Sequence, residues 1–248
     1  MKRLIKTELL KLTTIRTFAG ILLTGLILTL IRFTMVVVSA GKAETPALGT
    51  ASSTRDLLMS IGSGTILLLL FGVLAVTTEI RHGTIGWTFL ATPTRWRVLM
   101  AKLTAVVVSS LSYLIIVTLI VVGLSIGLLM REGLPVAAIG GELWAALGGA
   151  GLGTLLYATL GVGLGAIIRH QIAAVMVPLG WFMVVENLFP SFRLGPLYAW
   201  LPGGATAALA RADLPGLLPM WLGAVVLTGY TVAAVVIGVR VISTRDLT

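Results

Sequence analysis

The sequence predicts an all-α, polytopic membrane protein: six transmembrane helices preceded by an amphipathic helix. The chain of 248 residues is 57% hydrophobic and only 11% charged, with a mean hydropathy of +1.06. Soluble domains carry about 25% charged residues, so this chain has too little polar surface for a water-soluble fold of its size. Lipid is the solvent that such an excess of apolar surface requires.

Six apolar segments are long enough to cross a bilayer, which takes about 20 residues of helix. Irregular backbone cannot face lipid, so each is expected to be helical. They lie near residues 18–38, 57–78, 104–130, 143–168, 172–189 and 217–239. The first is long enough to be a retained helix rather than a signal peptide. The connections are too short to bury a core of their own, so 1–248 is expected to be a single transmembrane domain.

The lysines and arginines alternate in density between successive connections. Twelve of the 18 lie before the first span, after the second, after the fourth and after the sixth, whereas five lie on the other side and Arg32 falls within a span. The richer side is expected to be cytoplasmic, which places both termini inside. The net charge of +9 is therefore attributed to topology, and nucleic acid is not expected as a partner.

Residues 1–16 predict an amphipathic helix lying in the membrane interface. Ile5, Leu9 and Leu12 fall on one helical face, with the lysines elsewhere. Such a helix buries its apolar side in lipid and holds its lysines near anionic headgroups. A plain basic segment that sets topology is the alternative, but such a segment has no use for the internal Glu8.

The connection after the second span, residues 79–103, is longer than joining two helices requires. It begins with an acid at the membrane edge and contains a glycine that can turn the chain and a threonine–proline pair typical of a helix start. Its polar and helix-breaking residues include Glu79, Arg81, His82, Gly83, Thr84, Pro93, Arg95, Arg97 and Lys102.

Within this connection, the apolar stretch Ile85–Leu90 predicts a short helix across the cytoplasmic surface. Trp87, Phe89 and Leu90 are expected to be exposed there. Exposed apolar residues ringed by charge indicate a docking surface for a partner protein. An amphipathic segment lying on the membrane without a partner is the alternative interpretation.

The fourth span is rich in glycine. Gly149, Gly153, Gly161 and Gly165 recur at four-residue steps, with Tyr157 in the same series. Small residues on one face let helices approach closely in lipid, so this face is expected to pack against another helix.

Two ionisable residues, Arg32 and Glu186, fall within expected spans. Charges there are costly and are candidates for a substrate path or an inter-helix pair. Both lie toward the outer ends of their helices, where snorkelling to the interface is the alternative. The following loop, residues 190–216, holds aromatic residues and prolines and is expected to form either a short re-entrant element or a plain outer loop.

Several kinds of chemistry are excluded by what the sequence lacks. Cysteine is absent, and His82 and His170 are the only histidines, which argues against a metal site. The phosphate-binding pattern G-x-x-x-x-G-K-[ST] and the zinc pattern H-E-x-x-H are both missing. The chain is therefore not expected to be an enzyme itself, nor to bind a cofactor.

Three stretches resemble the ABC-2 type permease family of bacteria and archaea, and the topology does so over the whole chain. The middle stretch is the most specific. The matching residues are Glu8, Leu9, Leu10, Lys11, Leu12 and Arg16 in the first, Glu79 to Thr84 with Leu90, Pro93, Arg95 and Lys102 in the second, and Thr244, Arg245, Asp246 and Leu247 in the third.

The resemblance implies a permease subunit of an ATP-binding-cassette exporter in a prokaryotic cell membrane. The first stretch would be the family's amphipathic elbow helix, and residues 79–103 its coupling loop. Two separate ATPase subunits would bind ATP and Mg²⁺, and a second permease would complete a homodimer or heterodimer. The small size resembles exporters of drugs, peptide antibiotics or lipid-like molecules.

Two other classes remain as alternatives. A stand-alone secondary transporter or channel would show paired interrupted helices and charges at the midplane, which are scarce here. An intramembrane enzyme would need a nucleophile and a base at one depth, and both histidines fall in cytoplasmic connections.

Overall fold

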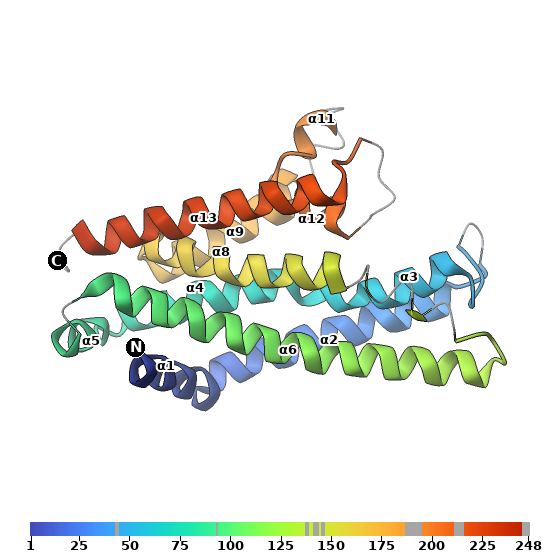
Figure 1. Cartoon of the computed structure of the whole chain (residues 1–248), viewed down its shortest axis with the longest axis horizontal. Coiled ribbons are helices and arrows are strands. Elements are labelled where there is room, and N and C mark those ends of the chain that lie inside the picture. The colour runs from blue at the N-terminus through green and yellow to red at the C-terminus, as the bar shows by residue number, and fades with distance from the viewer. Residues whose placement is uncertain are drawn as a thin grey trace.

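A computed structural model describes residues 1–248 except 43–44, 93, 137–138, 141–143, 145–146, 187–194, 211–215 and 245–248. Within this described part all regular structure is helical and no strand occurs, which confirms the all-α class. The long helices lie side by side along one axis (Figure 1). The start of α1 (Lys2–Thr14) and the end of α13 (Met220–Thr244) lie at the same end as α5 (Ile85–Ala91).

The remaining elements follow in chain order and include three turns that depart from α-helical geometry. They are α2 (Arg16–Ser39), α3 (Ala51–Met59), the 3₁₀ turn η1 (Ser60–Gly64), α4 (Thr65–Arg81), α6 (Arg95–Arg131), the π-helical turn η2 (Leu147–Gly151), α8 (Leu152–Ile168), α9 (Gln171–Gly180), the π-helical turn η3 (Trp181–Val185), α11 (Gly195–Tyr198) and α12 (Pro202–Leu209).

Five described helices are long and apolar enough to cross a membrane. They are Arg16–Ser39, Ala51–Arg81, Arg95–Arg131, Gly148–Ile168 and Met220–Thr244. The fifth of the six expected spans, 172–189, corresponds to the shorter apolar helix Gln171–Val185, and residues 187–189 lie outside the described part. Five spans are thus supported by length and composition, and the sixth stays a prediction.

The first helix and the first span are separate elements. Ile15 adopts an extended conformation (φ −81°, ψ 119°) between α1 and α2, so the chain bends there. Only Glu8 and Leu12 of α1 are buried, whereas its basic residues Lys2, Arg3 and Lys6 are exposed. This distribution matches an amphipathic helix, and its place in the membrane interface stays a prediction.

The glycines of the fourth span lie where neighbouring backbone comes closest. A methyl group at Gly161 would collide with the carbonyl oxygen of Leu69 in α4, and one at Gly165 would lie 2.7 Å from the carbonyl oxygen of Val73. At the other end of the series, a methyl group at Gly149 would collide with the carbonyl oxygen of Leu209 in α12. Only hydrogen fits at such contacts, so α8 approaches α4 more closely than larger residues would permit.

The remaining member of the series, Gly153, has more room. A methyl group there would make an ordinary contact of 3.5 Å with Cγ2 of Thr206. Gly163 lies on another face of α8, where an added methyl group would lie 2.7 Å from the carbonyl carbon of Ala234 in α13. The α8 helix therefore packs closely on α4 through Gly161 and Gly165, and on α13 through Gly163.

Candidate functional site at the junction of α1, α4 and α6

Four charged side chains from three helices form a closed ring, which we call the ionic cluster. Lys102 Nζ in α6 lies 2.6 Å from Glu79 Oε1 in α4 and 2.7 Å from Glu8 Oε2 in α1. Lys11 Nζ in α1 lies 2.7 Å from Glu8 Oε1 and 2.8 Å from Glu79 Oε1. Each lysine bridges both carboxylates, so the four formal charges cancel.

The ionic cluster is deeply buried at Lys102 and Glu8 and most exposed at Lys11. The side chains of Lys102 and Glu8 are 2% and 4% exposed, that of Glu79 is 12% exposed, and that of Lys11 is 34% exposed. Burying a single charge costs several kcal/mol, and the attraction of an opposite charge offsets this only in good geometry. A balanced ring with short contacts is therefore what allows the three helices to enclose four charges.

Lys11 shows the electrostatic effect of the ring. Its partial burial by itself lowers the pKa of the ammonium group, but hydrogen bonds from Lys11 to Glu79 and Glu8, and the charges of these carboxylates, outweigh burial. The pKa of Lys11 is therefore raised above its ordinary value. Lys11 stays charged at neutral pH and holds α1 against the end of α4.

The sequence contains the members of this ring but not their pairing. Glu8 and Lys11 are expected in the interface helix, whereas Glu79 and Lys102 are expected at the two ends of a connection. An acid inside a basic segment and an acid at the end of an apolar run are the available signals. Glu8 and Lys102 are 94 residues apart, and Lys11 and Glu79 are 68 residues apart. Only the fold brings these pairs together.

The α5 helix connects the end of α4 to the start of α6 and has one buried and one exposed face. Ile85 and Phe89 are buried, while Trp87 and Leu90 are 75% and 76% exposed. The expectation that Phe89 is exposed is therefore wrong, because Phe89 shares the inner face of the helix with Ile85, four residues earlier. The expected exposure of Trp87 and Leu90 is confirmed.

Arg95 connects α5 to two longer helices. Its guanidinium carbon lies 5.5 Å from the centroid of the Phe89 ring, within the range of a cation–π interaction. Its Nη1 donates to the carbonyl oxygen of Ile242 in α13 at 3.4 Å. Because Arg95 is also the first residue of α6, it joins α5, α6 and α13.

The other predicted coupling residues surround the turn between α4 and α5. Arg81 Nη1 donates to Gln171 Oε1 at the start of α9, at 3.1 Å. His82 ends α4, and its Nδ1 lies 2.7 Å from the carbonyl oxygen of Thr78. Gly83 has a φ of +68°, a conformation that favours glycine. Thr84 begins α5.

The other residues that the sequence singles out near the expected cytoplasmic end lie in the core, at the start of α2 or outside the described part. Leu9 and Leu12 pack in the apolar core, whereas Arg16 begins α2 and is exposed. Pro93 and the tail residues Arg245, Asp246 and Leu247 lie outside the described residues, so their expected roles stay predictions.

Glu186 and Arg32 do not meet among the described contacts. Glu186 is buried, and its Oε1 accepts from Trp181 Nε1 at 2.8 Å. The backbone N–H of Gly203, in the first turn of α12, also donates to this carboxylate. Arg32 is exposed and lines a cavity of about 350 Å³ together with Asp56. Glu186 is thus placed to cap α12, and a role for either residue in a substrate path stays a prediction.

No protein-family model matches this sequence, and no curated protein is found to be similar to it. Within the described ranges, no group of three or more histidine, aspartate or glutamate side chains is arranged to hold a metal ion. The functional argument for this chain therefore rests on its own residues.

Proposed function

We propose that this chain is the membrane-spanning permease subunit of an ATP-binding-cassette exporter, driven by ATPase subunits on separate polypeptides. The observation that carries this proposal is the position of α5, which connects α4 to α6, the two helices that Glu79 and Lys102 of the ionic cluster join. Trp87 and Leu90 form an exposed apolar surface, as expected for a docking site. On the three longer helices α1, α4 and α6, paired charges of the ionic cluster connect the helices near the same end of the molecule.

This arrangement provides a route by which a push on α5 would reach the spans. Ile85 and Phe89 attach α5 to the core, and Arg95 links it to the starting turn of α6 and the last turns of α13. The ionic cluster then joins α6 to α1 and α4. Because separating its members would leave unpaired buried charges, these helix ends should move together.

The ATPases would supply the energy and this chain would supply the path. Two ATPase subunits would bind ATP and Mg²⁺ and dock below α5, and a second permease subunit would complete the assembly in a prokaryotic cell membrane. Nucleotide binding would then bias an equilibrium between two access states of the spans. The transported molecule would be small and amphipathic, of the drug-like, peptide-antibiotic or lipid-like class.

The test is reconstitution with a candidate ABC ATPase subunit from the same organism. The wild-type chain should co-purify with that ATPase and stimulate its ATP hydrolysis in liposomes. The double variant Trp87→Ala, Leu90→Ala should weaken binding by about tenfold or more, the range for anchoring residues at an interface. Trp144→Ala is the matched control, because Trp144 is also 75% exposed but lies between α6 and η2, away from α5.

Two results would overturn the proposal. Binding and stimulation that are unchanged in the double variant would show that α5 is not the docking surface. Transport by the purified chain alone, driven by an ion gradient and independent of ATP, would identify a secondary transporter instead.

A further inference from the structure

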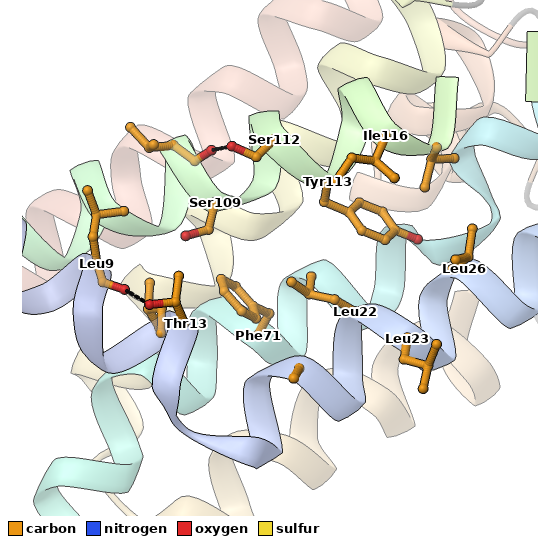
Figure 2. A pocket seen from close by; sticks show the side chains of 14 residues that line it. Leu9, Thr13, Leu22, Leu23, Leu26, Phe71, Ser109, Ser112, Tyr113 and Ile116 are labelled. Carbon is orange, nitrogen blue, oxygen red and sulfur yellow. Dashed lines mark hydrogen bonds between the residues drawn. The ribbon is translucent and has the colours of Figure 1, made fainter. Parts of the chain in front are cut away.

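An apolar groove lies between α1, α2, α4 and α6, on the side of α1 that carries Leu9 and Thr13 (Figure 2). Its volume is about 470 Å³. Phe71, Tyr113 and Val117 form a buried floor, whereas Leu23 and Ile116 at its rim are more than half exposed. The groove therefore opens sideways, between α2 and α6, onto the surface that the spans present to lipid.

The groove extends over the depth of one leaflet. On α6 its lining runs from Val108 to Val117, and on α2 from Ala19 to Leu26. At 1.5 Å per residue these stretches are about 14 Å and 10 Å long. Half of the hydrocarbon core of a bilayer is about 15 Å thick, so the groove matches the reach of lipid chains from one side.

Water is a poor occupant of this space. A buried water needs two to four polar partners, and the lining offers few. The hydroxyl of Tyr113 is buried there without a hydrogen-bond partner among the described residues, whereas those of Thr13 and Ser112 already donate to backbone carbonyl groups. Thr13 Oγ1 donates to the carbonyl oxygen of Leu9 at 3.1 Å, and Ser112 Oγ donates to that of Val108 at 3.0 Å. The walls are otherwise made almost entirely of hydrocarbon side chains, which favours an apolar occupant.

A basic residue, Arg16, lies close in sequence to the α1 end of the groove. Arg16 lies in sequence between Thr13 and Ala19, which both line the groove, and it is exposed. Within the described part of the chain Arg16 makes no ion pair with a carboxylate. An exposed arginine at the bend between an interface helix and a span is well placed to bind a phosphate oxygen.

We propose that this groove is a binding site for one acyl chain of an anionic phospholipid from the surrounding leaflet, with the lipid phosphate at Arg16. The bound chain fills the space between α2 and α6 and packs against the floor of Phe71 and Val117. Because Leu9 and Thr13 of α1 form one wall, the lipid also supports the position of α1. This site does not depend on the proposed transport function.

The first experiment uses the absence of cysteine from the chain. Ser112→Cys changes little volume and places a thiol in the groove, whereas Leu119→Cys places one on the same helix at a 69% exposed position outside the groove. Added phosphatidylglycerol should slow maleimide labelling of the Ser112→Cys protein in detergent several-fold and leave the Leu119→Cys protein unaffected. Equal protection of both positions would show ordinary surrounding lipid and overturn the proposal.

The second experiment separates the headgroup from the chain. Phosphatidylglycerol retained by the purified full chain should exceed phosphatidylcholine, and Arg16→Gln should reduce this preference by about fivefold, the effect expected of one basic residue near an anionic surface. Ser109→Phe, which fills the groove, should lower retention of both lipids. Equal retention of the two lipids by the wild type, or unchanged retention in Ser109→Phe, would overturn the assignment.

Discussion

The carboxylates of Glu79 and Glu186 are held in different ways. Glu79 has two lysines as partners, Lys11 and Lys102, which come from two other helices. Gln171, at the start of α9, bonds to Arg81 near Glu79. Glu186 lies about 15 residues after Gln171, so the helix carries it roughly 22 Å from that end of the molecule. Its described partners are neutral donors, the indole N–H of Trp181 and the backbone N–H of Gly203.

The difference indicates different roles for the two ends of the molecule. The ionic cluster joins segments that are far apart in sequence and keeps the ends of α1, α4 and α6 together. Glu186 closes a local contact and fixes the first turn of one short helix, α12. Damage at the ionic cluster should therefore loosen several helices, whereas damage at Glu186 should loosen one.

Lys102→Met should have the largest effect on stability. It leaves Glu8 and Glu79 buried with Lys11 as their remaining partner among the described contacts. Breaking a buried ion pair by removing one partner costs about 3–5 kcal/mol. The free energy of unfolding in detergent, measured by denaturant titration, should fall by this amount.

A double-mutant cycle tests the cause of that loss. Glu8→Gln combined with Lys102→Met removes one charge of each sign and should cost less than the sum of the two single changes. Arg97→Met is the control, because Arg97 is an exposed residue two positions into the same helix. Additive losses would show that Lys102 stabilises the protein by packing rather than by charge.

Glu186→Ala should have an intermediate effect. It leaves the N–H groups of Trp181 and Gly203 without their acceptor, which costs about 1–3 kcal/mol in a buried site. Glu186→Gln retains one acceptor oxygen and should lose less. Protease accessibility of α12 in the folded protein is the readout, with the exposed Glu132→Ala as control. A loosened α1 in place of a loosened α12 would contradict the comparison.

The parts of this fold that were predictable are those that depend on local pattern. Length and hydropathy were sufficient to predict the long apolar helices such as α6. The spacing of apolar and polar residues was sufficient to predict that α1 is an amphipathic helix. The outward position of Trp87 followed from an apolar stretch among charges. Each of these features depends on residues within a few turns of one another.

The parts that were not predictable depend on contacts between distant segments. The sequence does not show that Lys102 meets Glu8, because this pair requires α1 to lie against α6. The inward position of Phe89, by contrast, is a local feature, because Phe89 lies four residues after Ile85 on the buried face of α5. The fifth span shows another limit, because Pro178 and the π-helical turn η3 interrupt the regular helix there.

Lys11→Gln should have a smaller effect than Glu186→Ala, although Lys11 belongs to the ionic cluster. Its side chain is 34% exposed, so water screens its ion pairs and their loss should cost at most about 1 kcal/mol. Lys102 would still contact both carboxylates of the ionic cluster. The same denaturant titration measures this difference, and a loss as large as that of Lys102→Met would show that the two lysines are equivalent despite their unequal burial.

Raising the pH should have the smallest effect on stability, and it tests the contribution of Lys11 selectively. The pKa of Lys11 is raised in the folded protein, so its stabilising effect is complete below the ordinary lysine pKa of about 10.4 and is lost as the pH rises through the higher, folded-state pKa. The thermal midpoint should therefore fall more steeply above that pH in the wild type than in Lys11→Gln. Glu186→Ala should retain the full alkaline fall, since Lys11 is intact there. Equal slopes in the wild type and Lys11→Gln would show that Lys11 does not carry this dependence.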